Sequence, residues 1–186
     1  KVLKGISTTF HPGKTSLIIG QSGSGKTVFL KTLIGLHAPE EGTISFDGRI
    51  NTEFTIEGKR QWRQEIGMVF QGSALFDSQT VEENVMFPLK MFTDNSNSEM
   101  LDRVNFALNR VNLENSNLKL PAELSGGMQK RVAIARAIVM NPKYLFCDEP
   151  NSGLDPQTAT VIDKLIQALH ESLLKNLPIY QSSQVP

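Results

Sequence analysis

A glycine-rich pattern at residues 20–27 constrains this chain more than any other part of its sequence. It fits G-x-x-x-x-G-K-[ST], in which the backbone N–H groups of a turn surround a phosphate. The apolar run at residues 15–19 predicts a buried strand before the pattern, and residues 27–36 predict a helix with a broad apolar surface after it. A strand that leads through such a turn into a helix directs several N–H groups and the positive end of the helix dipole at one point. The predicted phosphate-binding loop consists of Gly20, Gln21, Ser22, Gly23, Ser24, Gly25, Lys26 and Thr27.

Two side chains at the end of this pattern supply the chemistry that the loop needs. Lys26 is long enough to reach the β- and γ-phosphates of a nucleotide, and the Thr27 hydroxyl is suited to bind Mg²⁺. The glycines permit backbone conformations and close approaches that a Cβ atom would oppose. The alternative is a purely structural turn rich in Gly and Ser, which the strand–turn–helix setting disfavours.

Composition excludes several other classes of protein. A chain of 186 residues can form one core with an inserted lobe, and its 19 basic and 19 acidic residues argue against a sequence-independent nucleic-acid binder. No apolar run approaches the roughly 18 residues of a membrane span, and nothing at the start resembles a signal peptide. The one cysteine, Cys147, excludes an intrachain disulfide and lies in an apolar run typical of a buried strand rather than of a reactive thiol. The three histidines are scattered and do not suggest zinc, so we expect a soluble chain of the cytosol.

Strand patterns alternate with helical ones, as in a parallel sheet that is covered by helices. Residues 66–70 and residues 144–147 are short apolar runs that predict buried strands. Residues 43–46 lead into Asp47 and Gly48, which predicts a strand that ends in a turn. The expected fold class is therefore α/β, with a small β element beside the parallel core.

The middle of the chain is predominantly helical. Residues 81–91 predict one helix, and the capping box formed by Ser96 and Glu99 predicts the start of a second. A third helix is expected after Gly127. Asp155, which is followed by a proline, predicts the start of a last helix because its carboxylate can cap the first turn.

Two adjacent acids, Asp148 and Glu149, follow the predicted strand at residues 144–147. Open α/β sheets bind ligands at the carboxyl ends of their strands, so this position suits Asp148 as a Mg²⁺ ligand. Glu149 points to the other side and is placed to orient or deprotonate an attacking water. Gln71 ends another predicted strand and can reach the metal or the water. The alternative for the two acids is a solvated turn, which the phosphate loop upstream disfavours.

A second Gly-rich segment, Leu124-Ser125-Gly126-Gly127, also precedes a helix. It combines a Ser hydroxyl, unshielded Gly backbone and a helix N-terminus, which together form an anion-binding site. One nucleotide does not need two such sites on one chain, but a two-fold dimer lets each segment serve the partner's γ-phosphate. The alternative is a plain helix cap, which is common for such a sequence.

Together these segments resemble the nucleotide-binding subunits of ATP-binding cassette (ABC) transporters over about residues 1–169. The resemblance implies a catalytic role for Glu149, Gln71 and Lys26, a metal-binding role for Thr27, Gln71 and Asp148, and nucleotide contacts from the phosphate loop and from the signature residues Ser125, Gly126 and Gly127. It also implies a nucleotide contact from Asp155, the last residue of a D-loop made of Ser152, Gly153, Leu154 and Asp155.

The same resemblance implies a P-loop NTPase fold with a RecA-like parallel sheet, an N-terminal antiparallel β portion and an inserted α-helical lobe. It implies one nucleotide-binding domain over residues 1–186. Residues 1–71 and 141–186 would form the catalytic core, and residues 72–140 would form the lobe that carries the signature.

The implied function is that of an ATP-hydrolysing subunit that uses ATP and Mg²⁺ to power a membrane transporter. Two copies of the chain would close around ATP as a homodimer, docked on an integral-membrane permease at the inner face of the cell membrane, with no nucleic-acid partner. Residues 72–78 and Met128 are similar to the ATPases of Mla/Mce-type phospholipid transporters. That narrower similarity implies phospholipid as the cargo and an Mce-domain lipid-binding protein as a further partner.

By the same resemblance, apolar residues of the helical lobe predict the docking surface for the permease. A coupling helix would contact Leu75, Phe76 and residues 88–92. The alternative is that these side chains form the core of the lobe, and for Leu89 and Met91 both interpretations stay open.

Both ends of the chain depart from the family pattern. The family carries an adenine-stacking aromatic upstream of Lys1, and a switch histidine where residues 181–184 are Gln-Ser-Ser-Gln. Residues 177–180 still predict a short strand. The sequence therefore resembles a fragment, or a variant with altered ends, and we expect weak ATP hydrolysis from it alone.

Two other functions stay open on the sequence. A soluble ABC ATPase of translation or repair usually resembles two cassettes in tandem or a cassette split by a coiled coil, and this chain has neither pattern. A nucleotide-binding module with impaired hydrolysis is the other alternative, which the altered C-terminus favours.

Overall fold

The computed structural model of the chain describes residues 2–176, apart from the side chains of Thr52 and of residues 172–176. The strand expected at residues 177–180 and the polar residues 181–184 lie outside that part. The strands are β1 (Ser45–Phe46), β2 (Arg49–Ile50), β3 (Ile66–Val69) and β4 (Tyr144–Cys147). The α-helices are α1 (Lys26–Leu33), α2 (Ile56–Gln64), α3 (Val81–Phe92), α4 (Asn97–Arg110), α5 (Gly126–Ile138) and α6 (Pro156–Asn176). Two short 3-10 helices are η1 (Asn51–Glu53) and η2 (Pro121–Glu123).

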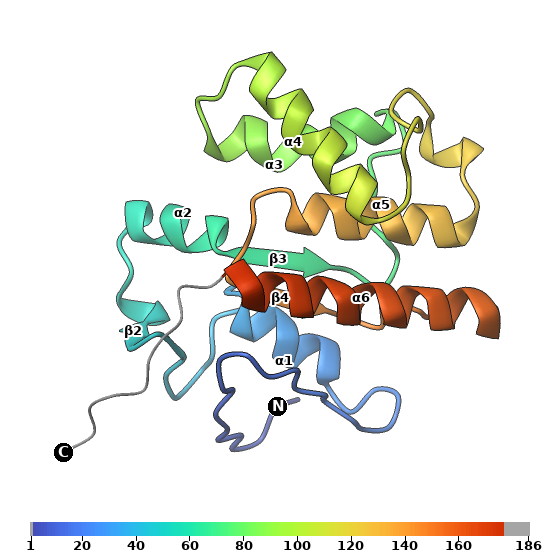
Figure 1. The fold of residues 1–186 in the computed structure, drawn as a ribbon. Coiled ribbons are helices and arrows are strands. Elements are labelled where there is room, and N and C mark those ends of the chain that lie inside the picture. Colours follow the sequence, from blue (N-terminus) through green and yellow to red (C-terminus); the bar gives the residue numbers. More distant parts are fainter. Residues whose placement is uncertain (1, 177–186) are drawn as a thin grey trace.

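Helix α5 lies at the centre of the molecule, between a pair of helices and a pair of strands (Figure 1). On one side it packs against α3 and α4, and on the other it packs against β3. The N-terminal half of α5 also faces the N-terminal half of α6. The described elements thus form a mixed α and β fold in which α5 lies between a helical layer and a parallel strand pair.

The strand predictions at residues 43–46, 66–70 and 144–147 are confirmed. β3 and β4 pair in parallel, with Ile66 opposite Tyr144 at one end of the register. β1 and β2 form an antiparallel hairpin. Asp47 and Gly48 connect them with φ of 49° and 75°, the left-handed pair that a tight type I′ turn requires.

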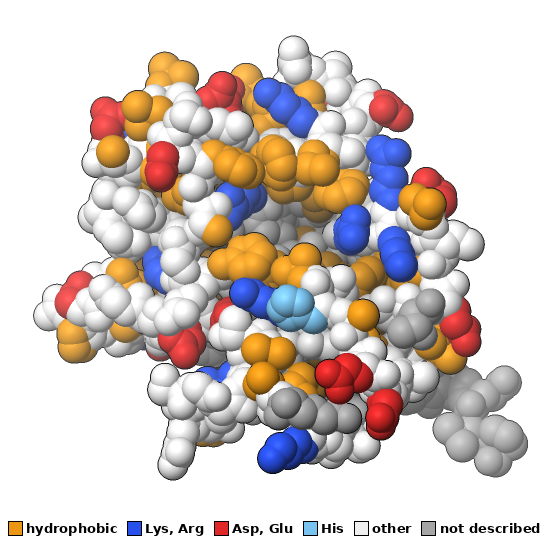
Figure 2. Space-filling model, turned by 180° about the vertical axis from the view of Figure 1, so that it is seen from behind, with side chains coloured by type: hydrophobic (Ala, Val, Ile, Leu, Met, Phe, Trp, Pro, Cys, Tyr) orange, Lys and Arg blue, Asp and Glu red, His pale blue; other side chains and the backbone are white. Residues whose placement is uncertain are grey.

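The prediction of a buried strand at residues 15–19 is wrong for this structure. These residues form no strand, and Leu17 and Ile19 are 81% and 83% exposed. A strand is stabilised by hydrogen bonds to a neighbouring strand and by burial of its faces, and within residues 2–176 β3 and β4 pair only with each other. The face of the molecule that is seen from behind in Figure 2 also carries hydrophobic side chains on its surface.

The helix predictions in the middle of the chain are confirmed. α4 begins after Ser96, whose hydroxyl accepts from the Glu99 N–H while the Glu99 carboxylate accepts from the Ser96 N–H. The predicted helix at residues 27–36 ends earlier, at Leu33, because Gly35 adopts a left-handed conformation with φ of 73°. Within residues 2–176, no helix has the length and apolar character needed to cross a lipid bilayer.

The main core fills the space between β3 and the helices. Val69 of β3, Val85 of α3, Val104 of α4, Ile134 of α5 and Ile162 of α6 are all fully buried. These five elements therefore share one core, so a shift of α5 would disturb both the helical layer and the strand pair.

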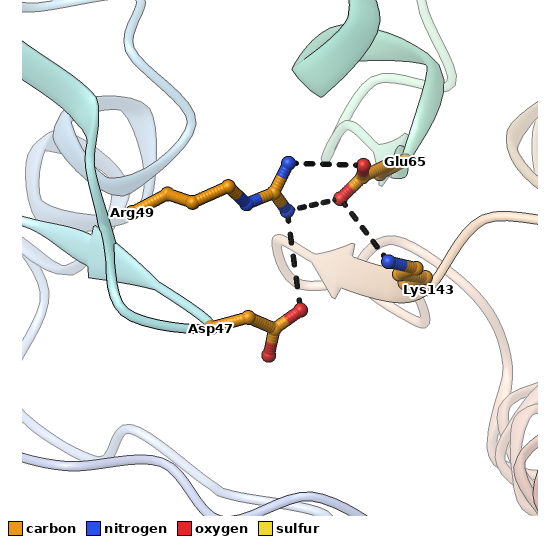
Figure 3. Close-up of polar contacts among 4 residues, drawn as sticks. All are labelled: Asp47, Arg49, Glu65 and Lys143. Carbon is orange, nitrogen blue, oxygen red and sulfur yellow. Dashed lines mark hydrogen bonds and ion pairs between the residues drawn. The ribbon is translucent and has the colours of Figure 1, made fainter. Parts of the chain in front are cut away.

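Helix α2, which the sequence analysis did not predict, attaches the β1–β2 hairpin to the strand pair. Its side chain Trp62 is 2% exposed and packs edge-on against Phe46 at a ring distance of 5.2 Å. Beside this contact, Arg49 of β2 donates to both carboxylate oxygens of Glu65 at 3.1 and 2.6 Å (Figure 3). Lys143 also lies 3.8 Å from Glu65, so the carboxylate joins β2 to the segment before β4.

Close packing of α5 on β3 leads to a first prediction, for Gly67→Ala. A Cβ atom at Gly67 would lie 2.4 Å from the carbonyl oxygen of Ala137 and 3.0 Å from Cγ of Pro142. We expect the substitution to lower the free energy of unfolding by about 1–3 kcal/mol, measured by chemical denaturation. Gly72→Ala is the matched control, because a Cβ atom there meets no atom within 4 Å. Equal unfolding midpoints for the two variants would contradict the close packing of α5 on β3.

Candidate functional site

The predicted phosphate loop at residues 20–27 leads directly into α1. Gly23 and Gly25 have φ of 77° and 98°, which other residues rarely adopt, and Gly25 is the residue that precedes the helix. A Cβ atom at Gly20 would lie 2.8 Å from the hydroxyl oxygen of Ser24, so the loop closes back on its own beginning. The turn and the helix therefore have the form that the sequence predicted, although the strand before them is absent from the described structure.

Lys26, the first residue of α1, extends its side chain over this loop. Its ammonium donates to the carbonyl oxygens of Gly20 and Gln21, both at 3.0 Å. The positive charge is thus held at the mouth of the loop, where a phosphate group would lie.

Thr27 is joined to the end of β4, 121 residues further along the chain. Its hydroxyl donates to a carboxylate oxygen of Asp148 at 3.1 Å. Adjacent ligands of an octahedral Mg²⁺ ion lie about 3 Å apart, since each is about 2.1 Å from the ion. Both atoms are oxygens, which Mg²⁺ prefers, so this pair fits two neighbouring positions of its coordination shell.

The two adjacent acids occupy different environments. Asp148 is 4% exposed, and its N–H continues the strand ladder by donating to the Val69 carbonyl at 2.9 Å. Glu149 is exposed and has a left-handed backbone with φ of 46°. The Gln71 side-chain amide donates to the Glu149 carboxylate at 2.7 Å, so the residues that follow β3 and β4 meet at one edge.

The signature residues begin α5. The Ser125 hydroxyl accepts from the Met128 N–H at 3.3 Å, and Gly126 and Gly127 form the first turn. A Cβ atom at Gly127 would lie 2.5 Å from Cγ2 of Thr158, so this turn packs closely against the start of α6.

Asp155 caps the start of α6. Its carboxylate accepts from the N–H groups of Gln157 and Thr158, both at 3.0 Å. The hydrogen bonds from Thr158 hold the pKa of Asp155 below its usual range. The carboxylate is therefore charged at neutral pH and serves as a helix cap in this structure.

The predicted site residues thus fall into two groups. Thr27, Gln71, Asp148 and Glu149 meet at the carboxyl ends of β3 and β4, with Lys26 beside them. The signature residues and Asp155 form the second group, where α5 and α6 begin. Within residues 2–176, no hydrogen bond joins the second group to the loop at residues 20–27.

Cys147 lies in β4 against the core, and burial raises the pKa of its thiol to about 12, so the thiol stays protonated and unreactive. No group of three or more His, Cys, Asp or Glu side chains in the described part of the chain is arranged to hold a metal ion.

The sequence analysis missed two cations of α5 that contact the segment after β3. The Lys130 ammonium donates to the Gln71 carbonyl, and the Arg136 guanidinium donates to the carbonyls of Ser73 and Ala74. The sequence holds a signal for Lys130, because it occupies the helical face that also carries Gly127 and Ile134, which are buried. A charge on the apolar face of a helix needs a polar partner inside the protein.

The sequence of the chain is similar to those of known proteins. The sequence pattern of the family described as "ABC transporter" matches residues 3–152. The chain is 39% identical over 173 residues to the "Probable ribonucleotide transport ATP-binding protein mkl" of Mycobacterium tuberculosis, covering 93% of this chain and 48% of that protein. It is 42% identical over 167 residues to "Methionine import ATP-binding protein MetN 1" of Pseudomonas putida, covering 90% of this chain and 50% of that protein. The chain therefore spans about half the length of the curated relatives it matches.

Solved structures of ABC ATPase cassettes are similar to this chain in sequence and in fold. The fold is thus that of an ABC ATPase cassette, a P-loop NTPase of mixed α and β content. The dimeric post-hydrolysis state of the ATP-binding cassette MJ0796 bound to ADP and Pi has a TM-score of 0.83 and 34% identity, covering 92% of this chain and 75% of that one. The cbiO1 protein of Clostridium perfringens, part of the cbiONQ transporter complex, has a TM-score of 0.82 and 35% identity, covering 92% of this chain and 68% of that one.

Proposed function

Because the chain belongs to the ABC transporter family, we propose that it binds ATP with Mg²⁺ and hydrolyses ATP to power a membrane transporter. ATP-binding cassettes of this family are ATPases that dimerise and associate with membrane permeases. The observation that carries the proposal is the meeting of Thr27 and Gln71 with Asp148 and Glu149 at one edge of the strand pair. Phosphoryl transfer depends mostly on positioning and electrostatics, and this edge combines a cation, a metal-binding oxygen pair and an exposed carboxylate.

Each residue has a distinct role in this proposal. The N–H groups of the loop and the Lys26 ammonium bind the phosphates, while Thr27 and Asp148 hold Mg²⁺. Mg²⁺, when bound, neutralises charge on the phosphate oxygens. Glu149 orients the attacking water and accepts its proton, and Gln71 holds the Glu149 carboxylate in place.

The experiment that tests the function is an ATPase assay on the full-length protein. We expect turnover with Mg²⁺, loss of turnover when the metal is chelated, and stimulation by the permease that co-purifies with the protein. Absence of turnover with Mg²⁺, with and without the permease, would overturn the proposal.

We further propose that two copies close around ATP, with the signature residues of each copy contacting the nucleotide of the other. The separation of the signature residues from the phosphate loop supports this arrangement, since one chain does not bring them together. Ser125→Arg is expected to keep ATP binding and to prevent ATP-driven dimerisation, measured by light scattering. Ser125→Ala is the control, because it removes the helix cap, worth about 1 kcal/mol, without adding bulk. Loss of ATP binding by Ser125→Arg would contradict the proposed place of Ser125.

For the permease, we propose a docking groove at the border between α2 and β3 and the helical lobe, which we assign to residues 72–140. A groove of about 280 Å³ lies between α2, β3, α3 and α5, and its lining includes Phe70, Phe76, Phe87, Pro88, Phe92 and Arg136. Phe76 is 39% exposed, and its ring lies 4.9 Å from that of Phe87. Met91 is also exposed, whereas Leu89 is fully buried, so the core interpretation is correct for Leu89.

Phe76→Ala is expected to weaken permease co-purification strongly while changing the melting temperature little, because the side chain contributes more to the groove than to the core. Phe106→Ala is the matched control, since Phe106 is 67% exposed on α4 and does not line this groove. A parallel loss of melting temperature and permease binding in Phe76→Ala would assign Phe76 to the core instead.

For the cargo, we propose phospholipid, supported by residues 72–78 and Met128, with an Mce-domain protein as a further partner. The relatives are named for ribonucleotide and methionine transport, which favours those cargoes as alternatives. ATPase stimulation of the purified permease complex by phospholipid vesicles, ribonucleotides or methionine distinguishes the three. The protein itself would then lie at the cytoplasmic face of the membrane, held by its permease.

A further inference from the structure

The segment that follows β3, residues 71–74, has an unfavourable backbone. Ser73 and Ala74 have φ of 62° and 49°, two consecutive left-handed residues without a glycine. Such conformations cost about 1–3 kcal/mol each and persist only where surrounding contacts hold them. The contacts that hold this segment must therefore offset the free-energy cost of its backbone conformation.

Those contacts come from α5, the helix that begins with the signature residues. Arg136 donates to the Ala74 and Ser73 carbonyls at 2.8 and 2.7 Å, and Lys130 donates to the Gln71 carbonyl. Arg136 also lies over the Phe76 ring, 5.9 Å from its centroid. Two cations of one helix thus fix the main chain of the segment at both of its ends.

Lys130 is the less expected of the two, because its side chain is 6% exposed within the apolar face of α5. Burial lowers the pKa of its ammonium, and the charge of Glu149 partly opposes that effect. A methionine or leucine would fill the same space without the cost of burying a cation. Packing alone therefore does not account for an ammonium group at this position.

The contacts form a continuous path from α5 to the carboxylate. Lys130 holds the Gln71 carbonyl, and the Gln71 side-chain amide donates to Glu149 at 2.7 Å. We infer that Lys130 is a positioning residue: it fixes the main chain of Gln71 so that the Gln71 amide orients Glu149 for hydrolysis. The inference rests on the proposed function, and it connects the signature helix to the attacking water through three residues.

The test uses steady-state kinetics on the full-length protein. Lys130→Met keeps an unbranched side chain that is one atom shorter and removes the donor. We expect kcat to fall at least about tenfold, since small misplacements of reacting groups have such effects. ATP affinity should stay within about twofold of the parent, because within residues 2–176 Lys130 makes no hydrogen bond to the phosphate loop. Lys130→Arg, which restores a cationic donor, should recover most of kcat.

Two further variants separate positioning from a merely structural role. Lys164→Met on α6 removes an exposed lysine and should leave kcat unchanged. In the Glu149→Gln background, Lys130→Met should lower the single-turnover rate by much less than in the parent, because both changes act on the same carboxylate. Lys130→Leu, which also lacks a donor, replaces Lys130→Met if the latter does not fold, and the same fall in kcat in the parent and smaller fall in the Glu149→Gln background are expected.

An active parent with unchanged kcat in Lys130→Met, or the same fold-loss in both backgrounds, would overturn the inference and leave the proposed function intact. A parent without ATPase activity would overturn the proposed function and this inference together.

Discussion

Glu149→Gln in the full-length protein is expected to slow ATP hydrolysis by roughly 10²–10⁴-fold, the range that a lost general base produces. The substitution keeps the shape of the side chain and removes the carboxylate that would accept a proton from water. In the described part of the chain, Glu149 makes no hydrogen bond to the loop at residues 20–27, so ATP binding should persist. The measurement is kcat for ATP hydrolysis alongside a nucleotide titration.

The same variant should accumulate as an ATP-bound dimer, visible by light scattering, because hydrolysis no longer reopens it. Glu57→Gln is the matched control, since Glu57 is exposed on α2 and remote from the strand ends. Hydrolysis at the parental rate by Glu149→Gln would move the general base to another residue.

Local signals in the sequence predicted the parts of the fold that local physics controls. The hairpin turn follows from Asp47 and Gly48, which accept left-handed conformations, and the start of α4 follows from the Ser96 and Glu99 capping box. These features depend on a few adjacent residues, so the sequence pattern is sufficient to identify them.

Features that depend on distant neighbours were harder to predict. Residues 15–19 have the composition of a buried strand, yet a strand also needs a neighbour to pair with, and composition does not supply one. Helix α2 was missed because most of its residues are charged or polar and it buries mainly Trp62. A single buried side chain produces no hydrophobic periodicity, so it does not predict a helix.

The sequence predicted the position of the candidate site because neighbouring parallel strands have their carboxyl ends at the same edge of the sheet. That rule predicted that Gln71, Asp148 and Glu149 lie close together. In the structure, Nε2 of Gln71 lies 2.7 Å from Oε2 of Glu149. Their chemical roles stay predictions. The helical position of Lys130 indicates that it is buried, but its partner was not predicted, because that partner is a main-chain carbonyl and no side-chain type marks it in the sequence.

The second large effect is expected from Lys26→Ala, which should weaken ATP binding. A hydrogen bond to a charged group contributes about 1.5–3 kcal/mol. Its loss corresponds to roughly tenfold to hundredfold weaker binding, measured by titration of the full-length protein with ATP. Lys31→Ala is the control, because Lys31 lies in the last turn of the same helix, away from the loop.

Stability should change little in Lys26→Ala, and this separates a binding role from a folding role. Among the described residues, the Lys26 ammonium donates only to the Gly20 and Gln21 carbonyls, which are exposed and can bind water instead. Those bonds must break before the ammonium can meet a phosphate, so the measured loss of affinity is a net value after that exchange. Unchanged ATP affinity in Lys26→Ala would remove Lys26 from the phosphate site. A large fall in melting temperature would instead mean that the ammonium mainly closes the loop.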